Sequence, residues 1–149
     1  MNSTIQAYQE YLVKEKNYSL LTVQAYVSDI LSFQEYLNNN HEATSVENVV
    51  YPQIRSWIVI LIENNISNTS VNRKVSSLKS YYKFLLKIKQ ITVNPLLKHK
   101  SLKTAKKIQI PFSEKELQDV FEFNSYSNDF EGIRNQLIIE LFYTTGIRR

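Results

Sequence analysis

The spacing of apolar residues constrains this chain most, because it follows the period of an α-helix through most of the sequence. Apolar residues recur three and four positions apart, and no sustained alternation of period two is present. Only two glycines and three prolines interrupt the 149 residues. The sequence therefore predicts an all-α protein.

Four helices are expected in the amino-terminal part of the chain. They span about residues 4–16, 20–37, 53–64 and 68–87. Ser19 can cap the second helix, and Pro52 can stand near the first turn of the third. The second helix has an expected buried stripe of Val23, Tyr26, Ile30, Phe33 and Leu37. The fourth has one of Val71, Val75, Leu78, Tyr82 and Leu85. These stripes predict a helical bundle.

The opposite face of the fourth helix is polar and cationic. Short serine side chains allow a helix to approach a groove closely, while lysine and arginine reach phosphates and asparagine or arginine can bond base edges. We interpret this face as a DNA-recognition surface, with an ordinary solvated face as the alternative. Its residues are Thr69, Asn72, Arg73, Ser76, Ser80 and Lys83, with Lys79 on the flank.

The distribution of charge supports a polyanionic partner more strongly than the net charge of +4 does. No aspartate or glutamate occurs between Asn64 and Ser113, yet most of the lysine and arginine residues fall in that stretch. Uncompensated positive charge over such a length is typical of a protein that follows a phosphate backbone.

The composition and the apolar pattern change after the bundle. Residues 95–112 include Pro95 and Pro111, carry five lysines and have no amphipathic period, which predicts an extended basic linker. Such a linker can lie along DNA, and the alternative is a flexible solubilising spacer. The lysines that we expect near the DNA backbone are Lys103, Lys106 and Lys107.

Two further helices are expected after the linker. Ser113 and Glu116 have the spacing of a capping box at a helix start. A last helix is expected over about residues 130–143, and its apolar side is of a kind that a domain core normally covers.

Composition excludes several other classes of protein and site. The chain has no cysteine and no apolar run near eighteen residues, and its first residues carry no secretory signal, so we expect a cytoplasmic protein without a membrane segment. His41 and His99 stand alone, without partners at metal-binding spacing. No metal site and no cofactor are expected.

Four stretches in the same order resemble the Xer-type tyrosine recombinases of the phage integrase family. "SLLTVQAYVSDILSFQEYL" is similar to the start of that family's amino-terminal core-binding domain, and "SNTSVNRKVSSLKSYYKFLL" to its DNA-facing helix. "NPLLKHKSLKTAKKIQIPFSEKEL" resembles the interdomain linker with the first catalytic-domain helix. "RNQLIIELFYTTGIRR" resembles the helix that leads into the T-G-hydrophobic-Arg motif.

The resemblance implies a domain organisation and a DNA-facing surface. Residues 1–94 would form a four-helix SAM-like core-binding domain, 95–112 the linker, and 113–149 the truncated start of the catalytic domain. Thr22 and Lys79 would approach phosphates of double-stranded DNA. The groove-lining set would be Asn72, Arg73, Ser76 and Lys83, with Ser80 beside them.

The resemblance also implies a catalytic role for Arg148, the arginine of the motif. In this family a tyrosine attacks a DNA phosphodiester to give a 3′-phosphotyrosyl link, without metal or ATP, and a planar guanidinium suits two oxygens of the phosphorane. The family's nucleophile lies beyond this motif, so none of the ten tyrosines is assigned to it. We expect the chain to bind DNA as a monomer without cleaving it, and the full-length recombinase to assemble with other subunits.

Two other functions stay open at this point. One is a DNA-binding regulator that lacks cleavage chemistry, which the rest of the gene would distinguish. The other is a helical protein-interaction module, which should bind DNA negligibly at moderate salt and tolerate charge reversal on the fourth helix. The stretch without acidic residues disfavours the second alternative.

Overall fold

A computed structural model describes residues 3–41, 45–105, 108, 110–122 and 126–147. The described part of the chain contains helices and no strand, which confirms the prediction of an all-α fold. It divides into two compact units, Met1–Ala105 and Lys106–Arg149, and each is described here by itself. Within the described ranges, no helix has both the length and the apolar character needed to span a membrane.

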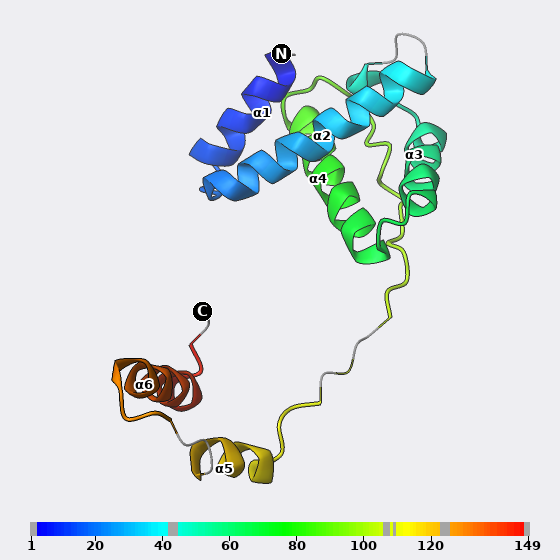
Figure 1. Cartoon of the computed structure of the whole chain (residues 1–149). Helices are drawn as coiled ribbons and strands as arrows, with labels where there is room; N and C mark the ends of the chain where they lie inside the picture. Colours follow the sequence, from blue (N-terminus) through cyan, green and yellow to red (C-terminus); the bar gives the residue numbers. More distant parts are fainter. Residues whose placement is uncertain (1–2, 42–44, 106–107, 109, 123–125, 148–149) are drawn as a thin grey trace. The chain divides into compact units, whose positions relative to one another are not determined.

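The first unit is a bundle in which α2 and α4 pack against each other, with α1 and α3 beside them (Figure 1). Its elements are α1 (Ser3–Lys14), α2 (Leu20–Asn40), the 3-10 turn η1 (Val46–Asn48), α3 (Tyr51–Glu63) and α4 (Asn68–Lys87). The four predicted helices are confirmed within three residues at each end, and α4 has the predicted bounds.

Local polar signals define the helix ends. Ser19 accepts a hydrogen bond from the Thr22 backbone at 3.3 Å, which confirms its role as the cap of α2. Asn17 and Asn65 adopt left-handed backbone angles, with φ of 51° and 59°, after α1 and α3. Asparagine tolerates this conformation better than most residues, so these positions turn the chain into the next helix.

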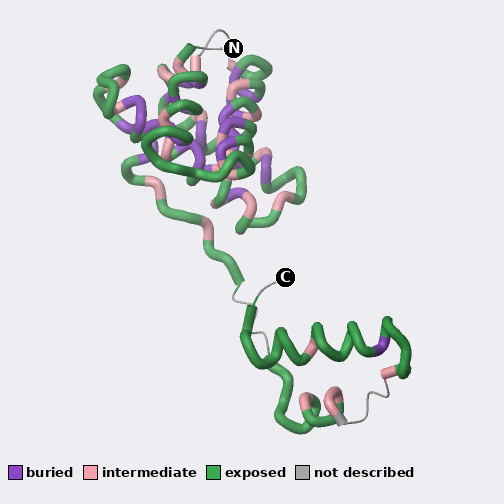
Figure 2. The backbone as a smooth tube through the Cα atoms, turned by 90° about the vertical axis from the view of Figure 1, so that its left-hand side faces the viewer, coloured by how far each residue is buried: buried purple, intermediate pink, exposed green. Residues whose placement is uncertain are grey.

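Buried residues gather in the helices of the first unit (Figure 2). They include the predicted apolar face of α4, and aromatic side chains contribute much of the core. All five residues of its predicted stripe are at most 4% exposed. Tyr8 packs edge-on against Tyr81 with ring centroids 5.1 Å apart, and the Tyr82 hydroxyl donates to the Val46 carbonyl at 2.9 Å. In α2 the stripe differs at one place, because Val27 is buried and Tyr26 is only partly buried.

The beginning of the predicted linker packs on the bundle. The Asn72 side chain exchanges two hydrogen bonds with the backbone of Leu102, each 2.9 Å long. The Asn68 amide donates to the Lys103 carbonyl at 2.9 Å, and Leu96 is fully buried. Residues 95–105 are therefore docked in the first unit, which extends beyond residue 94.

The second unit contains α5 (Glu114–Glu122) and α6 (Phe130–Thr145). The predicted capping box is confirmed, since Ser113 N–H donates to Glu116 Oε2 at 2.7 Å and Glu116 N–H donates to Ser113 Oγ at 3.3 Å. Gly146 ends α6 with a φ of 62°, which glycine adopts without steric cost. The large apolar residues of α6, from Ile133 to Phe142, are mostly exposed within the described part of this unit.

Candidate nucleic-acid interface

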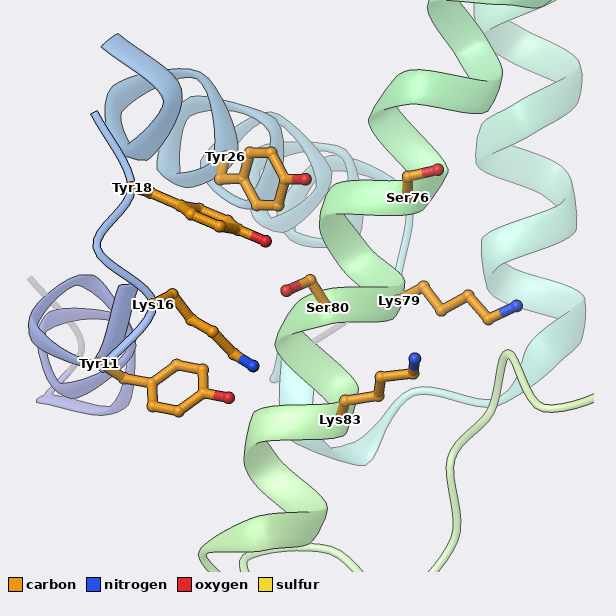
Figure 3. Close-up of a pocket in the computed structure, with 8 residues that line it drawn as sticks. All are labelled: Tyr11, Lys16, Tyr18, Tyr26, Ser76, Lys79, Ser80 and Lys83. Atoms are coloured by element: carbon orange, nitrogen blue, oxygen red, sulfur yellow. The ribbon is translucent and has the colours of Figure 1, made fainter. Parts of the chain in front are cut away.

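The carboxy-terminal half of the polar face of α4 lines a shallow surface pocket of about 290 Å³ (Figure 3). The other wall comes from α1, the connection between α1 and α2, and the first turns of α2. The lining residues are Tyr11, Lys16, Tyr18, Tyr26, Ser76, Lys79, Ser80 and Lys83. Four of the residues predicted to contact DNA therefore belong to one surface feature.

The polar ends of several of these side chains converge. In Figure 3 the hydroxyls of the three tyrosines and the ammonium group of Lys16 point toward α4, and the Ser80 hydroxyl points back toward them. Lys79 and Lys83 extend from the same helix on its other side. The pocket thus presents hydroxyl and ammonium donors from one side and continues into a cationic helix face on the other.

The electrostatic character of this surface is positive. No acidic residue lines the pocket, and across the described ranges none of Lys16, Lys79 and Lys83 lies within ion-pair distance of a carboxylate. Partial burial lowers the pKa of His99, and the charge of Lys79 lowers it further. A positive potential on this face is what an anionic partner requires.

Arg73 has a partner within the bundle. Its guanidinium donates to both oxygens of Asp29 at 2.8 and 3.0 Å, and the Asp29 side chain is only 2% exposed. Lys74 Nζ and Ser77 Oγ donate to the same carboxylate at 3.1 and 2.7 Å. The Arg73 side chain stays 51% exposed, so one edge of it faces solvent while the other joins α4 to α2.

Asn72 also has intramolecular partners. Both polar atoms of its amide bond the Leu102 backbone, so in this structure the residue fixes the docked segment. Thr22 lies half-buried at the start of α2, where its hydroxyl is 2.9 Å from that of Ser19. Lys103 is exposed and its carbonyl accepts from Asn68.

Three predicted site residues lie outside the described residues: Lys106, Lys107 and Arg148. The three residues of the T-G-hydrophobic-Arg stretch that precede Arg148 are described, with Gly146 in the left-handed conformation after α6.

Sequence reasoning missed the wall of the pocket opposite α4. The sequence predicts Tyr26 in the buried stripe of the second helix and indicates no role for Lys16, because neither belongs to the amphipathic pattern of α4. The one local signal is Asn17, whose residue type favours a tight turn and so a short connection between the first two helices. Asp29 had a signal as well, since a carboxylate three residues after Tyr26 and four before Phe33 lies along the buried stripe of α2.

Comparisons with known proteins give a consistent result. The family model of the phage integrase N-terminal SAM-like domain matches residues 5–89. Tyrosine recombinase XerC of Bacillus licheniformis is 37% identical over 139 residues, which cover 93% of this chain and 45% of that protein. A search of the solved structures found no match.

Other relatives show the same coverage. Tyrosine recombinase XerC of Anoxybacillus flavithermus is 38% identical over 148 residues, 99% of this chain and 49% of that protein. Tyrosine recombinase XerD of Rickettsia prowazekii is 35% identical over 144 residues, 97% of this chain and 46% of that protein. The chain spans about half the length of these curated relatives. With a matched SAM-like domain and these relatives, the chain belongs to the phage integrase family of tyrosine recombinases.

Proposed function

We propose that the chain is the DNA-binding part of a site-specific tyrosine recombinase. It binds double-stranded DNA through the carboxy-terminal half of the polar face of α4. The observation that carries the proposal is the group of lysines and serines that meet on this face without an acidic neighbour in the pocket. Lysines neutralise phosphates, and serine side chains are short enough to let the helix approach a groove.

The internal partners of α4 determine where contact with DNA is centred. Asn72 holds the docked segment and Arg73 holds Asp29, so the amino-terminal half of α4 is largely engaged within the bundle. Ser76, Lys79 and Lys83 follow in the next turns and are exposed. We therefore centre the DNA contact on these residues and on Ser80, with the free edge of Arg73 at its border.

Further phosphate contacts extend this surface in the proposal. Thr22 lies at the amino-terminal end of α2, where helix geometry favours phosphate binding. The proposed contacts after α4 are Lys103, Lys106 and Lys107.

The catalytic part of the proposal concerns Arg148 and the longer protein. The stretch Thr145–Gly146–Ile147–Arg148 matches the family's T-G-hydrophobic-Arg motif, and a guanidinium can stabilise the charge of a phosphorane through two hydrogen bonds. We assign cleavage through a 3′-phosphotyrosyl intermediate, assembly with other recombinase subunits and a cytoplasmic location to the full-length enzyme. The 149-residue chain is expected to bind DNA as a monomer without cleaving it.

The proposal is tested by fluorescence-anisotropy titration of a random duplex at several salt concentrations. The test variant is Lys79→Gln/Lys83→Gln, and the control is Lys14→Gln/Lys115→Gln, which removes two exposed lysines from other surfaces. Arg73 is left intact, because changing it would remove two of the four hydrogen bonds that the buried Asp29 carboxylate accepts.

Wild type is expected to bind with a steep negative salt slope. The test variant should weaken binding to all sequences and reduce the magnitude of the slope by about 2, whereas the control should not. Absence of binding at low salt, or equal binding by the two double variants, would refute the proposed interface. Absence of binding would also favour a protein-interaction module.

A further inference from the structure

We infer that the pocket between α4 and the α1–α2 connection is a niche for one phosphate group, and that a phosphodiester of the DNA backbone occupies it. The inference rests on the proposed function and adds a specific phosphate contact from a part of the chain that sequence analysis did not select. Lys16 is the principal cation of this contact, with the tyrosine and Ser80 hydroxyls around it.

The donors around the pocket match the chemistry of a phosphate. A phosphodiester offers two non-bridging oxygens that share one negative charge, and it accepts several hydrogen bonds. The ammonium group of Lys16 supplies up to three donors, and each tyrosine or serine hydroxyl can supply one. Because no carboxylate lines the pocket, an anion that enters meets no like charge there.

A buried hydroxyl group that needs a partner lies next to Ser80, one of the lining residues. Tyr8 is fully buried, and its hydroxyl makes no hydrogen bond of normal geometry in the structure. It lies beside Ser80, and Tyr11, Tyr18 and Tyr26 are among its electrostatic neighbours. An unsatisfied buried hydroxyl costs free energy, which a small adjustment of Ser80 toward Tyr8 would recover. Ser80 then links Tyr8 to the bound phosphate, accepting a hydrogen bond from the Tyr8 hydroxyl and donating one to a phosphate oxygen.

The protonation state of Tyr8 suits this arrangement. Burial raises the pKa of the phenol well above its ordinary value; the adjacent Ser80 hydroxyl opposes this in part, and the neighbouring tyrosines add to the rise. Tyr8 therefore stays a neutral donor at physiological pH and adds no negative charge next to Ser80.

Lys16 is held near the pocket before any ligand arrives. Its backbone N–H donates to the Tyr11 carbonyl at 3.2 Å, and its ammonium group lies 5.7 Å from the centre of the Tyr11 ring. Asn17 then turns the chain with a φ of 51°. Lys87 also lies over the Tyr11 ring, at 4.8 Å, but it is paired with Glu15. Among the described residues that line the pocket from the α1–α2 side, Lys16 is thus the cation available to an anion.

The first arm of the test compares Lys16→Gln with Lys14→Gln. Both lysines are exposed near the end of α1, and only Lys16 lines the pocket. Binding of a random duplex is measured by anisotropy at several salt concentrations. Lys16→Gln is expected to weaken binding about tenfold and to reduce the salt slope by about 1, and Lys14→Gln to change neither.

The outcomes separate this inference from the proposed interface. If Lys16→Gln binds like wild type while Lys79→Gln/Lys83→Gln is weakened, the niche is wrong and the interface on α4 stands. If none of these variants weakens binding, both are wrong.

The second arm identifies the source of the phosphate. Backbone amide chemical shifts of the ¹⁵N-labelled chain are followed during titration with inorganic phosphate, with sodium chloride at equal ionic strength as the control. Shifts at Tyr18 and Ser80 with both phosphate and duplex DNA would show that the niche also takes a free phosphate. Shifts there with DNA alone would restrict it to the backbone diester. No shift at these residues with either ligand would overturn the inference.

Discussion

The substitution Asp29→Ala is expected to destabilise the first unit severely. Asp29 is 2% exposed and accepts four hydrogen bonds from α4, two from Arg73, one from Lys74 and one from Ser77. Removing the carboxylate leaves two cations next to a space that offers them no partner. It also leaves Ser77, which is fully buried, with only a long 3.4 Å bond to the Arg73 carbonyl.

The structure sets the size of the effect. Breaking a buried ion pair by removing one partner costs about 3–5 kcal/mol. The lower end applies here, because the Arg73 and Lys74 side chains are 51% and 20% exposed and can recover part of their hydration. We therefore expect a loss of about 3 kcal/mol, which is a large share of the roughly 5–15 kcal/mol that stabilises a typical domain.

Urea unfolding followed by tryptophan fluorescence measures this loss. Trp57 is the single tryptophan and is 2% exposed in the core of the same unit, so its emission reports on that unit. With a slope of about 1.5 kcal/mol per molar urea, the midpoint should fall by about 2 M. Glu10→Ala is the control, because it removes a carboxylate from an exposed pair with Lys14 and should leave the midpoint unchanged. A midpoint for Asp29→Ala within 0.5 M or so of wild type would refute the reasoning.

Three smaller perturbations test other parts of the structure. Tyr82→Phe should cost about 1 kcal/mol in the same urea assay, because it leaves a buried carbonyl of η1 without its donor; an unchanged midpoint would contradict this. Asn72→Ala should accelerate hydrogen exchange at the Leu102 amide, which loses its acceptor, and unchanged protection would show that packing alone docks this segment. Hydrogen bonds from Ser113 lower the pKa of Glu116 below its usual 4.5. These bonds to the ionised carboxylate therefore stabilise α5 fully above pH 4.5. This stabilisation is lost as pH falls through the lowered pKa. Ser113→Ala removes the hydroxyl donor but keeps the backbone donor, so circular dichroism should show a reduced but remaining acid sensitivity.

Local signals allowed the helices to be predicted. If residues 68–87 form a helix, the spacing of Val71, Leu78 and Leu85 places all three on one face. Such an apolar face is stable only when another element covers it, and in the structure all three residues are buried. The capping box of α5 involves residues only three positions apart, so it could be predicted without knowledge of the fold.

The roles of polar residues on the other face of α4 were less predictable, because they depend on distant parts of the chain. Arg73 bonds Asp29 across 44 positions, and Asn72 bonds Leu102 across 30. No helical wheel distinguishes a polar side chain that faces solvent from one that holds another segment. The role of Lys16 also depends on the tertiary structure, because Lys16 and α4 line the same pocket only when α1 and α2 pack beside α4.

The position of the DNA on α4 is the central claim, and site-specific cross-linking tests it most directly. The chain has no cysteine, so Ser76→Cys and Ser56→Cys each introduce a single thiol. Both serines are exposed and their hydroxyls donate to the carbonyl four residues earlier, at 2.9 Å in α4 and 3.1 Å in α3. Each variant is mixed with duplex DNA that carries disulfide-activated tethers on its backbone. Rapid cross-linking at position 76 and little at position 56 is the predicted result, whereas equal yields or a preference for position 56 would contradict the proposed interface.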